Sequence, residues 1–443
     1  MKWDILPQLG LSQPALRTLQ RTLLVLGCGL IGLSQLALIA HAQESSRVRQ
    51  LRETRQCSGC NLREAQLQNT YLRQAALADA NLRDANLQSA NLQNADLRDA
   101  DLRNADLSHA NLRGANLRGA RLEGARLERV NVDETTILDD QWRQAITWLN
   151  NPNQGAGAVT GLGRASFQRS NLRQLTLEEE SRLRESDLSS SNLSYAVLAQ
   201  VDLRRSNLFN VDLRHAMLNQ SDLRRVDLRF ANLQHANLQA ANLDRANLAE
   251  ARLQQALLEA ANLQDANLQG ANLSGSVLAG ADLRGANLRT IVVDADTSLY
   301  QAQLRGVDLS GANLRGVNLQ EADLSRADLS DANLSSLLER PARPLNACIP
   351  QKGVTNLTFA DLERASFSNA DLGGVNLCNA NLSHADLSGA NLQQANLTAA
   401  NLNGADFSQA NLQGAIVDQT QLNNVDLCGA VMPDGTVKEC SDE

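Results

Sequence analysis

The chain of 443 residues has very few bulky side chains: Phe, Trp and Tyr together make up 3% of it, and it has only three methionines. A globular protein of this length normally uses more of these side chains to fill its core. The sequence is dominated instead by Leu, Ala, Asn, Asp and Gln. Such a narrow composition indicates internal repetition rather than a single globular core.

Signals for catalysis are also missing. The glycine-rich stretch 155–163 is not followed by the Lys-Ser/Thr pair of a phosphate-binding loop. Only five histidines are present, while Asp and Ser recur everywhere, so a Ser-His-Asp arrangement could be drawn on paper by chance. We therefore predict no enzyme activity, no cofactor and no metal site.

Neither sign of charge predominates strongly. The chain has 41 basic and 49 acidic side chains, which gives a formal net charge of −8. This balance favours solubility, but it is too mild for a general binder of polyanions and for a mimic of DNA over the whole surface. We expect no nucleic acid among the partners.

The N-terminus has the pattern of an export signal. Residues 22–40 contain no charge and follow Arg17 and Arg21, and Ala40-His41-Ala42 is typical of a signal-peptidase site. The uncharged run is also almost long enough to span a bilayer. Residues 1–42 are thus either a cleaved signal peptide or a retained membrane anchor. Either alternative places the rest of the protein outside the cytoplasm, in a periplasm, a thylakoid lumen or the extracellular space.

The cysteine count fits an exported protein. There are seven cysteines, and removal of Cys28 with the signal leaves an even number, as expected for a disulfide framework. Proximity in the sequence favours the pairs Cys57–Cys60, Cys348–Cys378 and Cys428–Cys440. Other connectivities remain open, and Cys57-Ser-Gly-Cys60 is also compatible with a redox motif, although no βαβ pattern surrounds it.

A five-residue period runs through most of the sequence. From Leu62 onward a large apolar residue recurs at every fifth position, through Leu127 and Val132 to Ile137, usually with Ala two places before it and Asn or Asp one place before it. On an α-helix each step of five rotates by about 140°, and on a flat strand five is odd, so neither element keeps the leucines on one face. The chain must therefore coil around its own leucines.

This pattern resembles the pentapeptide repeat family, whose repeat is A-(D/N)-L-X-X; a typical unit here is Ala80-Asn81-Leu82-Arg83-Asp84. The resemblance implies an all-β fold, a right-handed quadrilateral β-helix with four units per coil. In that fold the Leu and the preceding Ala point inward, and Asn or Asp at the corner bonds to nearby backbone. We expect roughly 16 coils of about 4.8 Å each.

Breaks in the period divide the chain into segments. These are a signal or anchor (1–42), an N-terminal cap (43–60), repeats (61–137), a helical insertion (138–163), repeats (164–334), a Pro-rich loop (335–356), repeats (357–432) and a C-terminal tail (433–443). Single extra residues between Leu177 and Leu183, and between Val293 and Leu299, are expected to form corner bulges.

Two of these segments are expected to cover apolar surface. In the insertion, Trp142, Ile146 and Leu149 fall on one helical face, which should pack on the solenoid wall or cover an end. The insertion and the tail resemble those of cyanobacterial pentapeptide repeat proteins. Residues 45–56 are a candidate capping helix, because the open end of a solenoid exposes apolar groups and backbone edges.

With four units per coil, residues 20 apart form columns on the surface. The units from Leu183 to Leu248 bring several of the few aromatic residues together with arginines, a composition common at interfaces. The candidate interface is Tyr195, Arg204, Arg205, Phe209, His215, Arg224, Arg225, Arg229, Phe230, His235 and Arg245. A chance scatter of surface residues is the alternative interpretation.

The sequence as a whole predicts a non-enzymatic scaffold or interaction solenoid outside the cytoplasm. The candidate interface would bind an acidic protein or an anionic polymer. One alternative function is a nucleic-acid mimic that inhibits a topoisomerase, as some pentapeptide repeat proteins do. Another is an accessory protein that stabilises a membrane complex. The sequence does not name the partner or the oligomeric state.

Overall fold

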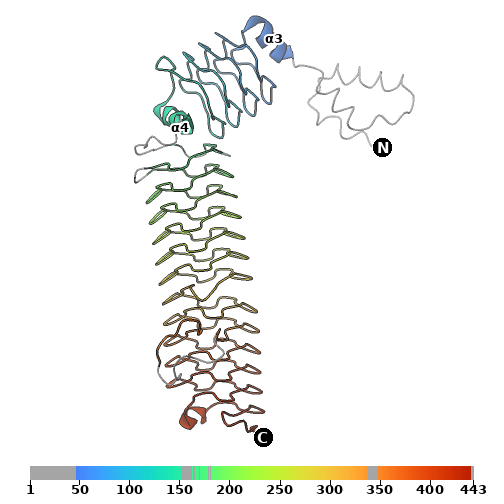
Figure 1. Ribbon diagram of the computed structural model, residues 1–443. Coiled ribbons are helices and arrows are strands. Elements are labelled where there is room, and N and C mark those ends of the chain that lie inside the picture. The colour runs from blue at the N-terminus through green and yellow to red at the C-terminus, as the bar shows by residue number, and fades with distance from the viewer. Residues whose placement is uncertain are drawn as a thin grey trace, which may run out of the picture.

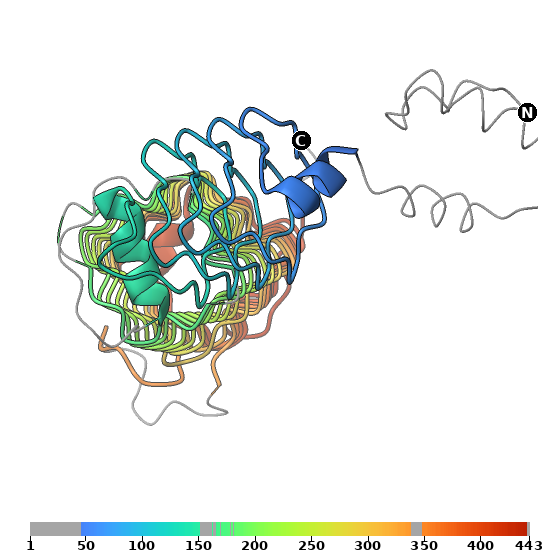
Figure 2. The ribbon, with the colours of Figure 1, turned by 90° about the horizontal axis from the view of Figure 1, so that it is seen from above.

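The computed structural model describes residues 46–150, 162, 165–168, 170–177, 179, 181–337 and 348–440. These residues form a solenoid in which parallel β-bridges join residues 20 apart, as from Asn81 to Asp101 and on to Arg121 (Figures 1 and 2). Twenty residues are four five-residue units, so each coil has four sides. The predicted β-solenoid is confirmed.

One unit shows why the backbone turns a corner every five residues. Ala80 and Leu82 are fully buried, and the Ala85 amide donates to the Leu82 carbonyl at 3.1 Å, which closes a tight turn. The third residue of that turn, Asp84, has a φ of 59°, a left-handed conformation that is unfavourable for most side chains. Its amide donates to the Arg103 carbonyl of the next coil at 3.0 Å, so stacking holds the turn in place.

The Asn or Asp before each Leu has the predicted role at the corner. Its side-chain oxygen accepts a hydrogen bond from the amide two residues on, as Asn81 Oδ1 does from Arg83 at 3.2 Å. Equivalent residues also bond between coils, as Asn267 Nδ2 does to Asn247 Oδ1 at 3.1 Å. This position therefore stabilises both the turn and the stacking.

The coils form two stacks, a shorter one set at an angle to a longer one (Figure 1). Helix α3, Ser46–Thr54, covers the first coil with Val48 and Leu51 buried, and lies within residues 45–56, the candidate capping helix. Gln56 already forms a bridge with Ala76. The repeats therefore begin one unit earlier than the predicted residue 61.

Helix α4, Asp140–Asn150, lies at the junction of the two stacks (Figure 1). Trp142 and Ile146 are buried in the core and Leu149 packs against it, as the helical spacing predicts. The Arg143 guanidinium donates to the carbonyl of Asp133 at 3.2 Å. The insertion thus covers the apolar surface where the coils are interrupted.

Residue Ile137, predicted to point inward, does not do so. It is 52% exposed, whereas Leu138 is 8% exposed and takes the inward position. The bridge from Asn116 to Ile137 spans 21 residues, so one extra residue lies in this coil. Leu138 therefore closes the first set of repeats, and the helical insertion begins after it.

The same threonine contact occurs at three interruptions of the repeat. In each, a threonine hydroxyl accepts a hydrogen bond from the amide of a left-handed glycine in the preceding coil. The pairs are Gly114–Thr136 at 3.2 Å, Gly275–Thr297 at 3.2 Å and Gly316–Thr355 at 2.8 Å. At the first two interruptions the carboxylates of Asp133 and Asp294 accept from the same amides, at 3.1 and 2.8 Å. These side chains replace the backbone contact that the extra residues remove. The bulge predicted between Val293 and Leu299 is one of these.

The other predicted bulge and the C-terminal end follow from the bridges. Thr176 pairs with Val197, 21 residues on, whereas Arg182 pairs with Asp202, 20 residues on, so an extra residue lies between them. Near the end, the 3₁₀ helix η2, Gln419–Leu422, replaces one unit, which the sequence did not predict. The tail folds back, with Val431 and Val437 antiparallel.

The predicted signal or anchor of residues 1–42 lies outside the described residues. Within the part of the chain that the structure describes, no helix has both the length and the hydropathy to cross a bilayer. Of the predicted Pro-rich loop, residues 335–337 and 348–356 are described.

The inward position of Leu138 can be tested with its neighbour as the control. Leu138→Ala should lower the free energy of unfolding of the last coil before α4 by about 2–5 kcal/mol, because it leaves a cavity. Ile137→Ala should change it by less than about 0.5 kcal/mol, because its side chain is already exposed. Amide hydrogen exchange over residues 111–138 measures both. Equal effects, or a larger effect of Ile137→Ala, would show that the register is wrong.

Candidate functional site

The residues of the candidate interface lie on three of the four sides of the long stack. We call the outward residues of the units centred on Leu203, Leu223 and Leu243 the Arg face. Those of the units centred on Leu208 and Leu228 form the Phe face, and those of the units centred on Leu193, Leu213 and Leu233 form the His face. Because units follow one another around a coil, the Phe face joins the other two. The candidates therefore wrap around the rod.

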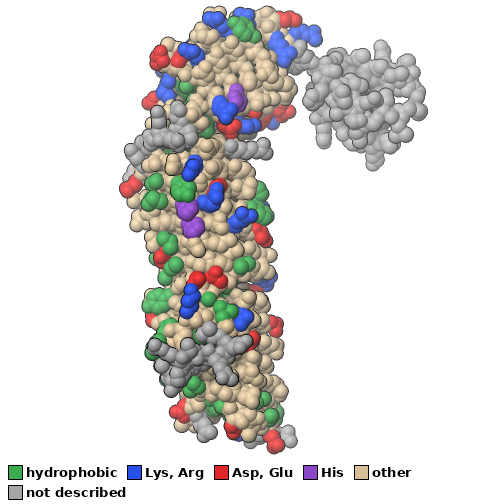
Figure 3. Space-filling view, viewed as in Figure 1, with side chains coloured by type: hydrophobic (Ala, Val, Ile, Leu, Met, Phe, Trp, Pro, Cys, Tyr) green, Lys and Arg blue, Asp and Glu red, His purple; other side chains and the backbone are tan. Residues whose placement is uncertain are grey.

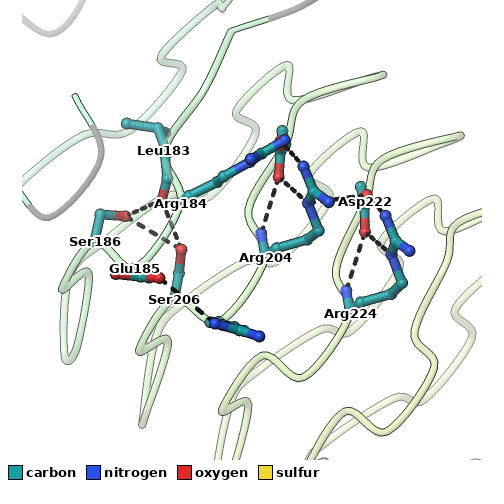
Figure 4. A network of polar contacts seen from close by, with 10 residues as sticks. Leu183, Arg184, Glu185, Ser186, Arg204, Ser206, Asp222 and Arg224 are labelled. Atoms are coloured by element: carbon teal, nitrogen blue, oxygen red, sulfur yellow. Dashed lines mark hydrogen bonds and ion pairs between the residues drawn. The ribbon is translucent and has the colours of Figure 1, made fainter. Parts of the chain in front are cut away.

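The arginines of the Arg face are bound to carboxylates of their own units. Arg204 donates from Nε and Nη2 to Asp202 at 2.9 and 2.8 Å, and Arg224 does the same to Asp222 at 2.8 and 2.6 Å. The Arg204 Nε also lies 3.3 Å from Asp222 of the next coil. The result is a ladder of alternating charge along the rod, which Arg184 extends by contacting Asp202 (Figure 4).

The arginines two positions after the central Leu are more exposed: Arg205, Arg225 and Arg245. Arg205 has 61% of its side chain exposed and lies 3.8 Å from Glu185, and Arg245 lies 3.2 Å from Asp265. Arg205 and Glu185, together with Arg225 and Asp244, line part of a shallow groove of about 390 Å³. The groove is thus lined by both signs of charge. The columns of arginines in the sequence did not reveal the pairing with the corner residues Asp202 and Asp222.

The Phe face carries a small aromatic cluster. The rings of Phe209 and Phe230 meet edge to face, with centroids 5.6 Å apart. The Arg229 guanidinium lies 5.5 Å from the Phe209 centroid. It also donates from Nε and Nη2 to the Asp227 carboxylate, at 2.9 and 2.7 Å. Phe230 is 53% exposed. The structure therefore holds an exposed aromatic ring in a fixed position, which reduces the entropy lost on binding.

The His face is a stack of rings. Tyr195 and His215 are parallel, with centroids 4.7 Å apart, and His215 and His235 are likewise 4.7 Å apart. The Arg173 guanidinium lies over Tyr195 at 5.2 Å. Figure 3 shows two histidines in purple, one above the other on the long stack. The 20-residue register places each ring directly above the previous one.

The described residues contain no group of three or more His, Cys, Asp or Glu side chains placed to hold a metal ion.

Several contributors to the surface were not predicted. Arg173, Arg184 and Arg214 extend or flank the candidate columns. The 20-residue spacing that identified Arg204 identifies them too, when the columns are continued by one coil or one position. A further cleft of about 580 Å³ lies at the junction of the two stacks, lined by Arg83, Glu123 and other residues. No sequence signal reports the angle between the stacks.

The six cysteines outside the N-terminal segment lie in the three pairs that sequence proximity favours. Their Cα–Cα separations are 5.2 Å for Cys57–Cys60, 5.5 Å for Cys348–Cys378 and 4.4 Å for Cys428–Cys440. These distances lie within the range for disulfides. The first and third pairs lie near the two ends of the solenoid, and the second joins the Pro-rich loop to a coil.

Comparison with protein families gives one match, to the model described as Pentapeptide repeats, over residues 60–133, 162–290, 297–335 and 355–429. This is more than half of the chain. The chain belongs to the pentapeptide repeat family. The family fold is a right-handed β-helix solenoid, and its members are in general structural or interaction proteins rather than enzymes.

Solved structures of the family are similar to parts of the chain. HetL, a pentapeptide repeat protein involved in heterocyst differentiation regulation in Nostoc sp. strain PCC 7120, is 34% identical over 61% of this chain and 94% of its own, with a TM-score of 0.28. QnrB1, a plasmid-mediated fluoroquinolone resistance protein, is 16% identical over 40% of this chain and 87% of its own, with a TM-score of 0.23.

A pentapeptide repeat protein of the Arabidopsis thaliana thylakoid lumen is 32% identical over 27% of this chain and 73% of its own, with a TM-score of 0.14. No curated protein sequence matches the chain significantly. Because all three TM-scores are low, family membership rests on the repeat match.

The ion pairs within units predict a dependence of stability on pH. Hydrogen bonds from Arg284, at 2.9 and 2.6 Å, are the largest cause that lowers the pKa of Asp282 to about 2. A lowered pKa stabilises the fold above the unfolded value of about 3.9, and this contribution is lost as the pH falls toward 2. Asp282→Asn should therefore lower the Tm at pH 7, with a much smaller difference from the wild type at pH 2, where Asp282 is partly protonated.

Circular dichroism melts at the two pH values measure this difference. The matched control is Asp331→Asn, which alters an exposed aspartate of the same stack and should leave the Tm nearly unchanged at both values. A deficit of Asp282→Asn that stayed constant from pH 7 to pH 2 would contradict the role of the Arg284 pair.

Proposed function

We propose that this pentapeptide repeat protein is a non-enzymatic scaffold that acts outside the cytoplasm and binds a protein partner through the candidate interface on units 183–248. The observation that carries the proposal is the fixed, exposed aromatic groups beside arginines on the Phe and His faces. Aromatic and arginine side chains are enriched where protein partners bind, because they combine large contact area with few rotatable bonds.

The charge of this surface defines the partner more closely. Arg204, Arg224 and Arg229 are already paired with aspartates, so they offer little free charge. Arg205 and Arg225 project beyond these pairs at the corner next to the Phe face. A partner with one or two carboxylates beside an apolar segment fits this arrangement better than a uniformly anionic polymer does.

The same ion pairs bear on the alternative of a nucleic-acid mimic. A mimic of duplex DNA needs a continuous negative surface, whereas arginines alternate with aspartates along the Arg face. We therefore prefer a scaffold to a topoisomerase inhibitor. The alternative of an accessory protein for a membrane complex is compatible with the same interface, because it differs in where the partner lies.

Substitution of the interface tests the proposed function. Arg205→Ala, Arg225→Ala and Phe230→Ala combined should abolish the principal crosslinks between these coils and a partner, as identified by mass spectrometry in the native cell. The fold should survive, because all three side chains point outward. The control is Arg305→Ala, Arg326→Ala and Phe359→Ala, which removes the same groups from later coils. The interface would be refuted if the crosslinks survived the three interface substitutions. It would also be refuted if the control substitutions abolished the crosslinks as well.

Support for a location outside the cytoplasm comes from two features. Residues 22–40 carry no charge and precede a signal-peptidase pattern. Three cysteine pairs lie at disulfide distance, which is common in proteins of oxidising compartments and rare in the cytosol.

Processing of the chain tests this location. Cleavage after Ala42 should give a mature protein that begins at Gln43 in a non-cytoplasmic fraction, with its six remaining cysteines resistant to thiol labelling until a reductant is added. Mass spectrometry of the intact protein, with and without reduction, measures both properties. An uncleaved chain in the membrane fraction would show that residues 1–42 are a membrane anchor and not a cleaved signal peptide. An uncleaved chain with free thiols in the cytoplasm would contradict export.

A further inference from the structure

The fourth side of the long stack differs from the other three in its charge. We call the outward residues of the seven units centred on Leu198, Leu218, Leu238, Leu258, Leu278, Leu299 and Leu319 the neutral face. Of its 21 outward positions only Glu259 and Glu321 are charged, whereas 14 of the 21 equivalent positions of the Arg face, continued over residues 202–326, are charged. The scarcity of charge is therefore a property of this face and not of the repeat.

Most of the first units of the neutral face lack the hydrogen bond that an Asn or Asp side chain usually accepts at the corner. Its residue Asn237 accepts from the Gln239 amide at 3.0 Å, which is the usual corner contact. The residues at the same position in the neighbouring coils are apolar and cannot form this bond: Val197, Met217, Leu257 and Val277. Met217 is 45% exposed and Leu257 is 36% exposed. The sequence thus exposes apolar groups on a flat surface where Asn or Asp would stabilise the turn.

Of the two charged residues of the neutral face, Glu321 is hydrogen-bonded to neighbours on that face. Glu321 accepts from the Gln301 side chain at 2.7 Å and from the Tyr300 hydroxyl at 3.2 Å, both on the same face. Glu259 stands alone among apolar and amide side chains of its neighbours. A strongly charged partner finds no complementary group here, unlike on the Arg face.

We propose that the neutral face is a homodimer interface, in which two copies of this chain pack side by side along units 197–321. In a twofold dimer the same patch meets itself, so a charged face would meet its own charge while an uncharged one would not. This matters for a chain with a net charge of −8. The 21 outward residues per copy also match the about 20–30 residues that each partner contributes to a stable interface.

The dimer leaves the candidate interface accessible. The Phe face lies on the opposite side of the coil from the neutral face, because two units separate them in each turn. Two copies would therefore present two Phe faces that point away from each other. The inference is independent of the proposed partner, since either surface can function without the other.

Sedimentation velocity of the full chain over about a hundredfold range of concentration tests the dimer. The wild type should sediment as a dimer, and Met217→Lys with Leu257→Lys should raise the dimer dissociation constant at least tenfold, because both ammonium groups would be buried against apolar groups. The control is Ala249→Lys with Gln269→Lys on the Phe face, which adds the same charge and should leave the dimer intact. Circular dichroism verifies that each variant is folded.

Three outcomes would overturn the proposal. The wild type could sediment as a monomer at every concentration. A folded Met217→Lys, Leu257→Lys variant could remain dimeric, which would place self-association elsewhere, such as in residues 1–42. The monomer could gain mass only when a neutral polysaccharide such as dextran is added, which would assign the neutral face to a carbohydrate.

Discussion

Stacking of one coil on the next is the interaction on which the rest of the structure depends. Most of the described five-residue units contain a residue with a left-handed backbone, and most of these residues are not glycine. Alone, such a turn is unfavourable. It persists because its amide and those of its neighbours bond to carbonyls of adjacent coils, and because the inward leucines pack on one another. Stability is therefore shared between neighbouring coils rather than located in a single core.

The same stacking organises the surface. Because side chains 20 residues apart lie one above the other, a preference at one position becomes a stripe along the rod. The Asp-Leu-Arg units build a charge ladder on the Arg face, the rings of Tyr195, His215 and His235 build a stack, and the lack of charge produces the neutral face. Few sequence changes thus suffice to give each side of the rod its own chemistry.

Most of this fold can be predicted from the sequence, because the five-residue period keeps all the leucines inside only if the chain coils around them. It fails where two apolar residues are adjacent: Ile137 keeps the period and Leu138 breaks it. The contacts of Thr136 and of the Ile137 backbone with the preceding coil place Leu138 inward. The 3₁₀ helix at Gln419–Leu422 was missed for the same reason, since Leu422 preserves the spacing.

The surface was harder to predict than the core. The columns of Tyr195, His215 and His235 follow from the 20-residue spacing alone. The geometry within a unit decides whether an arginine is paired with a carboxylate. The pairing of Arg204 with Asp202 therefore could not be predicted from the 20-residue columns. The neutral face was not predicted because its outward positions contain few charged or aromatic residues.

The 20-residue register is the central claim, and a crosslink tests it most directly. Gln234→Cys with Gln254→Cys places two thiols at equivalent positions of neighbouring coils on the His face, where the Cα spacing of about 4.8 Å between stacked chains suits a disulfide. The pair should close within one chain under mild oxidation, as mass spectrometry of the monomer would show. Gln234→Cys with Glu259→Cys, one unit further around the coil, should not close. The opposite pattern would contradict four units per coil.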